Sequence, residues 1–125
     1  MAVEYDIYKA VAGYMRHQYP NNLWHFDLAG VSMSKAQAGK TKAIQRGRGF
    51  PDLQILEPRG GFNGLFLEIK RNGERIFKKD GTFASEHILE QADWLNGLRL
   101  RGYKAEFAVG FDECKTIIDA YFAQK

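Results

Sequence analysis

Two short motifs in the middle of the chain carry side chains that could do chemistry. Pro51-Asp52 is followed, after a segment rich in turn formers, by Glu68-Ile69-Lys70. Residues i and i+2 of an extended strand face the same side, so Glu68 and Lys70 would share one face. Two carboxylates beside an ammonium can hold a divalent cation and stabilise charge on a phosphate. The motifs therefore predict a metal-dependent nuclease, provided that the fold brings Asp52 next to Glu68 and Lys70.

The segment between the motifs favours a hairpin that would bring them together. Its turn formers are Pro58, Gly60, Gly61 and Gly64. We expect a strand over residues 50–56 before the turn and another over residues 64–70 after it. The aliphatic face of the second strand carries Leu65, Leu67 and Ile69, opposite the charged pair. In such a hairpin Asp52 returns alongside Glu68 and Lys70.

The rest of the chain predicts the elements that must hold this hairpin in place. Hydrophobic periodicity and capping residues give the following expectations: a helix over 3–19, a strand over 23–28 with Trp24, Phe26 and Leu28 on one face, a short helix from Lys35 to Gln45 capped by Ser34, a helix from Ser85 to about Arg101, a strand over 103–109, and a final helix capped by Asp112. A strand, helix and strand at this spacing imply a right-handed crossover to a parallel neighbour. The expected architecture is α/β, a mixed sheet with helices packed on it.

Two polar residues fall on helix faces that should be buried. Glu4 lies on or beside the inward stripe of the first helix, where it either complements the helix dipole or reaches the metal site. Gln91 lies between Ile88 and Leu95 on the buried stripe of its helix and needs a partner. That partner could be a strand end, Lys70, a water or the phosphate.

Positive charge gathers in two segments that flank the motifs. The first, residues 29–49, contains no acid and carries Lys35, Lys40, Lys42, Arg46 and Arg48. The second, residues 71–84, interleaves aromatic residues with Arg71, Arg75, Lys78 and Lys79. The first segment is either a solvated surface or an arm that contacts phosphates, and its place beside Asp52 favours the arm. The second could grip nucleic acid, close the core as a solvated hairpin, or pair with another subunit.

Composition narrows the class of protein. The chain of 125 residues suits a single domain over residues 1–125, with a net charge of +3 that is compatible with nucleic acid. Cys114 is the one cysteine, which excludes an internal disulfide and a cysteine-rich zinc site. No signal-peptide region or membrane-length apolar run is present. We therefore expect a cytoplasmic protein, in a bacterium or a phage-infected host cell, with no membrane partner.

The motifs together resemble those of a known family. Gly49-Phe50-Pro51-Asp52, Glu68-Ile69-Lys70, Gln91-Ala92-Asp93-Trp94-Leu95 and Gly102-Tyr103 follow one another in the order found in the VRR-NUC family, the virus-type replication-repair branch of the PD-(D/E)xK nucleases. The resemblance spans residues from about 4 to 122. It implies a restriction-endonuclease-like core (αβββαβ, a mixed sheet flanked by helices) that hydrolyses DNA phosphodiesters with Mg²⁺ or Mn²⁺. It also implies a homodimer that cuts branched DNA, including Holliday junctions, during replication, repair or recombination.

The resemblance assigns roles to individual residues. Asp52, Glu68 and the backbone carbonyl of Ile69 would be metal ligands, Lys70 the catalytic lysine and Gln91 the family's glutamine. Glu4 matches an acid often found on the first helix of the family and would be a further ligand. The basic insertion at residues 71–84 is less typical of the family, so the preferred DNA structure stays open.

Two other functions fit part of the sequence. A non-catalytic nucleic-acid-binding subunit would explain the basic segments, but not why Asp52, Glu68 and Lys70 are all present. A sequence-specific restriction-type endonuclease would use the same core and cut one short duplex sequence. No base-reading element is evident, so we expect contacts to the DNA backbone and recognition of shape.

Overall fold

A four-stranded mixed sheet lies at the centre of the fold, in the strand order β1-β2-β3-β4. The computed structural model describes residues 2–27 and 34–125. In chain order the elements are α1 (Ala2–Gln18), β1 (Trp24–Phe26), α2 (Lys35–Ala43), β2 (Leu53–Ile55), β3 (Leu65–Lys70), α3 (Glu86–Arg99), β4 (Lys104–Val109) and α4 (Gly110–Phe122). This arrangement confirms the predicted α/β fold, with the short α2 inserted between β1 and β2.

The predicted hairpin and the predicted crossover are both present. Strands β2 and β3 pair antiparallel with Leu53 opposite Leu67, and the connection between them turns through Gly60 and Gly61, both with positive φ. Strands β3 and β4 pair parallel, with α3 as the crossover between them. The register of β2 against β3 places the residue before Leu53 next to Glu68, at the end of the sheet.

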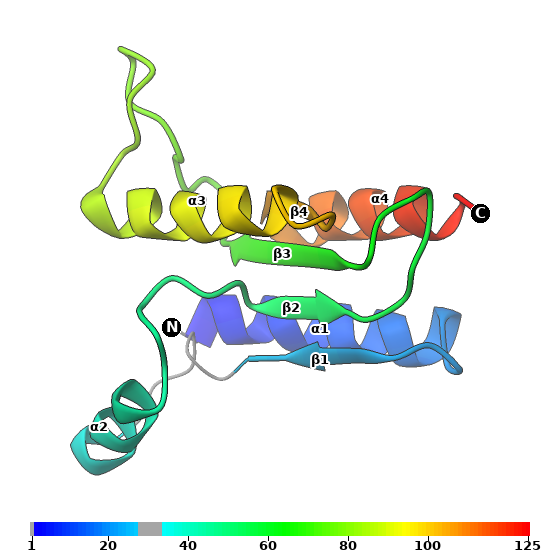
Figure 1. Cartoon of the computed structure of the whole chain (residues 1–125), viewed down its shortest axis with the longest axis horizontal. Helices are drawn as coiled ribbons and strands as arrows, with labels where there is room; N and C mark the ends of the chain where they lie inside the picture. Colours follow the sequence, from blue (N-terminus) through cyan, green and yellow to red (C-terminus); the bar gives the residue numbers. More distant parts are fainter. Residues whose placement is uncertain (1, 28–33) are drawn as a thin grey trace.

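Helices cover both faces of the sheet, so β3 is buried along its whole length. The larger core cluster joins α1 and α4 to one face, and its sheet residues are Leu53, Ile55, Leu65, Leu67, Ile69 and Ala108. The smaller cluster joins α3 to the other face through Phe66, Leu95 and Ala105. Figure 1 shows α2 set apart from these layers and the 71–84 segment projecting beyond the start of α3.

The two helices of the larger cluster are tied together by hydrogen bonds as well as by apolar contacts. The hydroxyl groups of Tyr14 and Tyr19, on or just after α1, donate to one oxygen of Asp119 on α4, at 2.5 Å and 2.6 Å. Lys115 donates to the other carboxylate oxygen at 2.9 Å. The two tyrosine hydroxyls thus tie α1 to a charged acceptor on α4, and Lys115 holds that acceptor in place from its own helix.

The boundaries of the strands and of the last helix differ from the sequence prediction. Strand β2 begins at Leu53 rather than at residue 50. Strand β1 ends at Phe26, and the predicted strand position of Leu28 lies outside the described residues. The predicted cap of α4 at Asp112 is wrong, because the cap position is Val109 and Asp112 lies in the first turn. Gly110, with φ 79°, turns the chain from β4 directly into the helix, and Glu113 accepts the Val109 amide at 2.9 Å.

The short helix agrees closely with its prediction at its beginning. Ser34 caps α2 and accepts the amide of Gln37, whose side chain accepts the Ser34 amide in return. The helix ends at Ala43, two residues before the predicted end, and none of its residues is buried. In the part of the chain that the structure describes, no helix is long and apolar enough to span a membrane.

Candidate active site

The Asp52 side chain lies at the end of the sheet, just before the first residue of β2. The Asp52 carboxylate accepts the amide hydrogen of Ile69 on β3 at 2.7 Å. The backbone carbonyl oxygen of Asp52 accepts the Asp27 amide, also at 2.7 Å. The Asp52 carboxylate therefore bonds the β3 backbone amide as a neighbouring strand would. This bond holds the carboxylate beside Glu68 and brings the Ile69 backbone to the site. The convergence predicted from the two motifs is confirmed for these residues.

Four polar side chains at this end of the sheet are buried. The exposed fractions are 4% for Asp52, 3% for Glu68, 4% for Lys70 and 5% for Gln91. Burying charged and polar groups costs free energy unless partners compensate for the lost water. A cluster of this kind indicates a functional site rather than a contribution to the core.

The two carboxyl groups interact strongly with each other. Burial and then the charge of Asp52 raise the pKa of Glu68 well above its ordinary value of 4.5. Burial also raises the pKa of Asp52, although the nearby Glu68 carboxyl, the Tyr8 hydroxyl and the Ile69 amide oppose that shift. The pair thus keeps a proton at neutral pH when no cation is close by. The site stabilises the charged forms of its two acids poorly, so it is suited to bind a cation that would favour those forms.

Lys70 is held from two sides. Its ammonium donates to the side-chain oxygen of Gln91 on α3 at 2.6 Å, and it lies 3.6 Å from a carboxylate oxygen of Glu74. The Gln91 amide nitrogen lies 3.2 Å from Nε2 of His87, one helical turn earlier. Lys70 is thus one of the partners that the sequence left open for Gln91, and the structure brings the two together.

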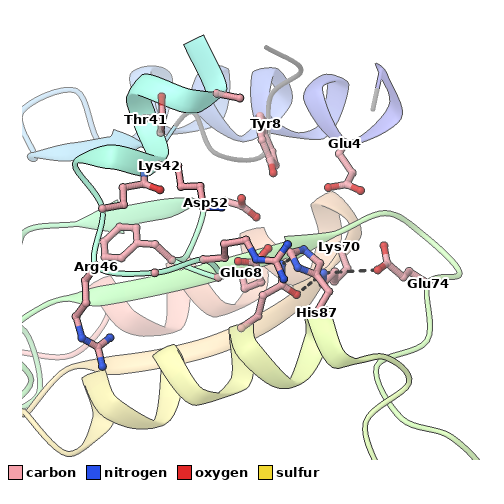
Figure 2. Close-up of a pocket in the computed structure, with 17 residues that line it drawn as sticks. Glu4, Tyr8, Thr41, Lys42, Arg46, Asp52, Glu68, Lys70, Glu74 and His87 are labelled. Atoms are coloured by element: carbon pink, nitrogen blue, oxygen red, sulfur yellow. Dashed lines mark hydrogen bonds and ion pairs between the residues drawn. The ribbon is translucent and has the colours of Figure 1, made fainter. Parts of the chain in front are cut away.

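The buried cluster opens into a cleft of about 690 Å³. Figure 2 shows Glu4 and Tyr8 extending from α1 toward Asp52 on one side, with Lys70 and Glu74 paired on the other. The charge of Glu4 contributes to the raised pKa of Glu68, so the two acids act on each other across the cleft. Glu4 thus lies at the predicted site, and its role as a metal ligand stays a prediction.

The segment between α2 and β2 forms the wall of the cleft above α3. The indole nitrogen of Trp94 donates to the Arg48 carbonyl at 2.8 Å, and the Arg46 guanidinium lies over the Trp94 ring at 5.2 Å. Gly49 adopts φ 96°, and a Cβ at this position would come within 3.0 Å of the Gln91 backbone nitrogen. Trp94 is half-buried and anchors this wall.

The structure separates the predicted nucleic-acid-binding residues into two groups. Lys42, Arg46 and Arg48 line the cleft, and Arg48 also forms an ion pair with Glu90 at 3.1 Å. The remaining basic residues are exposed and do not line it: Lys35, Lys40, Arg71, Arg75, Lys78 and Lys79. The last four belong to a segment closed as a hairpin by pairing of Phe77 with Phe83, whose rings stack at 5.1 Å.

Among the cleft residues that the sequence did not predict to act there are Tyr8, Glu74 and His87. Tyr8 lies one helical turn after Glu4, and His87 one turn before Gln91, so helical spacing from a known candidate could have indicated both. Glu74 is the first acid after Lys70 in an otherwise basic stretch, and it reaches Lys70 through a turn in which its amide bonds the Arg71 carbonyl at 3.1 Å. Asn72-Gly73 is a local turn signal, and Gly73 adopts φ 81°, so the sequence could have indicated this turn.

The donor set suits a hard divalent cation. Asp52 and Glu68 offer carboxylate oxygens, which Mg²⁺ and Mn²⁺ prefer, and Mg²⁺ keeps several waters, so few protein ligands suffice. The buried Tyr8 hydroxyl has no hydrogen-bond partner among the described residues, which fits a polar guest in the cleft. Within residues 2–27 and 34–125, no three His, Cys, Asp or Glu side chains are grouped to hold a metal ion. The site thus offers two acidic ligands, not a closed cage.

Comparison with known proteins supports the fold. No protein-family model and no curated protein matches the chain. Among solved structures, it is similar to a "VRR_NUC domain protein" with a TM-score of 0.73 and 25% sequence identity, over 98% of this chain and 89% of that chain. The chain therefore has a VRR-NUC-like fold, which confirms the fold that the motifs implied.

Proposed function

We propose that this protein is a metal-dependent endodeoxyribonuclease that hydrolyses phosphodiester bonds. The observation that carries the proposal is the buried group of Asp52, Glu68 and Lys70 at the floor of a cleft. Two acids and an ammonium at one sheet end are expensive to bury, and apolar residues would pack there at lower cost. The likeness in fold to a VRR_NUC domain protein points to the same chemistry.

Each residue of the cluster has a role in the proposed reaction. Asp52 and Glu68 would hold Mg²⁺ or Mn²⁺, together with the Ile69 carbonyl. When bound, the cation would polarise the scissile phosphate and lower the pKa of a bound water. Lys70 orients the attacking water or stabilises the negative charge that develops on the phosphate. Gln91 holds the ammonium of Lys70 in place through the 2.6 Å hydrogen bond.

The substrate follows from where the positive charge lies. Lys42, Arg46 and Arg48 line the cleft and would contact the backbone next to the cut. The hairpin within 71–84 would hold a second segment of nucleic acid at a distance from the cleft. Two separate basic regions suit branched DNA such as a four-way junction, and a homodimer would place two such sites for paired incisions.

The decisive experiment measures cleavage of labelled linear, flap and four-way DNA with Mn²⁺ or Mg²⁺. We expect the parent protein to cut branched DNA, and EDTA to stop the reaction. Glu68→Gln and Lys70→Ala should abolish cleavage while retaining the fold and much of the DNA affinity. Lys104→Ala, which removes a partly exposed lysine of β4 that does not line the cleft, is the matched control and should cut normally.

The outcomes separate the competing functions. Cleavage that persists in EDTA, or a Lys70→Ala protein that cuts at the parent rate, would contradict the proposed mechanism. Tight DNA binding without any cleavage would indicate a non-catalytic subunit. Cutting of one short duplex sequence, with junctions ignored, would indicate a restriction-type enzyme. Light scattering during size-exclusion chromatography tests the homodimer.

A further inference from the structure

The Tyr8 hydroxyl is the one buried side-chain polar atom without a hydrogen-bond partner in the described part of the chain. Tyr8 is 4% exposed and lies on the inward face of α1. Buried hydroxyl groups are almost always paired, since leaving one unpaired costs the lost hydration. An exception at the edge of a proposed active site indicates a partner that arrives from outside the chain.

The position of the hydroxyl is fixed by its ring. The Tyr8 ring packs against Phe26 with centroids 5.4 Å apart, and Tyr8 is a member of the larger core cluster. The side chain lines the cleft and extends from α1 toward Asp52 in Figure 2. Asp52 is near enough for its charge to act on the hydroxyl, but the two groups lack the geometry of an ordinary hydrogen bond.

The hydroxyl is a neutral group at any pH at which the protein would work. The ordinary pKa of a tyrosine hydroxyl is about 10, so the group keeps its proton at neutral pH. A neutral phenol can accept a hydrogen bond through its oxygen while its proton points to a carboxylate. It therefore offers a neutral acceptor in the cleft that Asp52 and Glu68 also line.

We propose that Tyr8 is a positioning residue whose hydroxyl accepts a hydrogen bond from the hydration shell of the cation held by Asp52 and Glu68. This inference rests on the proposed function and names a residue that the sequence motifs do not include. Two carboxylates leave most positions around Mg²⁺ to water, and those waters need acceptors in the cleft. Groups that hydrogen-bond the ligands of a metal fix their orientation and increase its affinity. Tyr8 supplies such a group from the helix opposite Lys70.

The test compares Tyr8→Phe with the parent protein by calorimetric titration of Mg²⁺ and by thermal unfolding in EDTA. The substitution keeps the ring and its contact with Phe26, so the variant should fold. We expect Mg²⁺ to bind about 10-fold more weakly. The unfolding temperature in EDTA should be unchanged or higher, because the unpaired hydroxyl is removed. A purely structural role would lower the unfolding temperature and leave the affinity as it was.

Tyr14→Phe is the matched control. It removes a tyrosine hydroxyl from the same helix, but one that is bonded to Asp119 and does not line the cleft. This variant should unfold at a lower temperature and bind Mg²⁺ as the parent does. Tyr8 and Tyr14 thus give opposite results in the two measurements.

Equal Mg²⁺ affinity of Tyr8→Phe and the parent would overturn the role of Tyr8 and leave the proposed nuclease intact. A lower unfolding temperature of Tyr8→Phe in EDTA would overturn it as well, because the hydroxyl would then be paired within the chain. A parent protein that shows no binding isotherm, with heat neither released nor absorbed, for Mg²⁺ or Mn²⁺ would overturn the metal-dependent function itself. The two failures are therefore distinguishable.

Discussion

The ammonium of Lys70 donates a 2.6 Å hydrogen bond to the side-chain oxygen of Gln91, which joins the end of β3 to α3 at a buried contact. Both side chains are almost inaccessible to water, so each depends on the other to replace its hydration. Glu74, at 3.6 Å, is the other group that pairs with this ammonium. The contact thus serves the fold and orients the lysine proposed to act on the phosphate.

Replacing Gln91 by alanine should weaken both functions of this contact. The buried ammonium loses its closest acceptor, so we expect unfolding to require about 1–3 kcal/mol less free energy and cleavage to slow markedly. Urea unfolding and a single-turnover cleavage assay measure the two effects. Asn96→Ala, an exposed change on the same helix, is the control and should alter neither quantity. A fully active Gln91→Ala protein would show that Lys70 needs no support from α3.

Gly49→Ala should damage the wall of the cleft. Gly49 has φ 96°, and the added Cβ would lie 3.0 Å from backbone atoms of Glu90 and Gln91, which cannot move without shifting α3. We expect a loss of about 1–3 kcal/mol in the free energy of unfolding together with reduced cleavage. Gly47→Ala, where a Cβ meets nothing within 4 Å, is the matched control. Equal stability of the two variants would contradict the close approach of this loop to α3.

Asp119→Asn should make the free energy of unfolding less dependent on pH in the acid range. Burial acts to raise the pKa of Asp119, but hydrogen bonds from Tyr14, Tyr19 and Lys115 outweigh it and lower the pKa below its ordinary value of 3.8. A lowered pKa in the folded state contributes stability above pH 3.8, and this contribution is lost as the pH falls through the folded-state value.

At pH 7 the Asp119→Asn variant should be less stable than the parent by about 1–2 kcal/mol, and the difference should shrink at pH 3 and below. Urea unfolding at several pH values measures it. Asp112→Asn, an exposed change on the same helix, serves as the control. A difference that stayed constant from pH 7 to pH 2.5 would rule out a charged role for Asp119.

Lys42→Gln should weaken DNA binding by an electrostatic route. Lys42 lines the cleft beside Arg46, where a phosphate would displace counterions. We expect lower affinity for every DNA structure and a salt dependence whose slope falls by about 1. Fluorescence anisotropy at several salt concentrations measures the slope, with Lys115→Gln on α4 as the control. An unchanged slope would place the DNA elsewhere on the surface.

The alternation of side chains and the turn formers were enough to predict the centre of the site. Leu65, Leu67 and Ile69 face the larger core cluster, and Glu68 and Lys70 face the other way, as period-two spacing requires. The glycines of the turn set the hairpin, and the hairpin sets the register that places Asp52 beside Glu68. These features are readable along the chain because they depend on neighbours a few residues apart.

The rest of the site depends on packing between distant elements. Tyr8 reaches the carboxylates because α1 and α4 cover one face of the sheet, while Gln91 reaches Lys70 from α3 on the other. The raised pKa of Glu68 arises from burial under all of these elements together. The hydrogen bond from Trp94 to the Arg48 carbonyl, 46 residues apart, likewise helps to determine which basic residues face the cleft. Local patterns specify strands, turns and caps, but burial and electrostatic coupling exist only after the layers close around the end of the sheet.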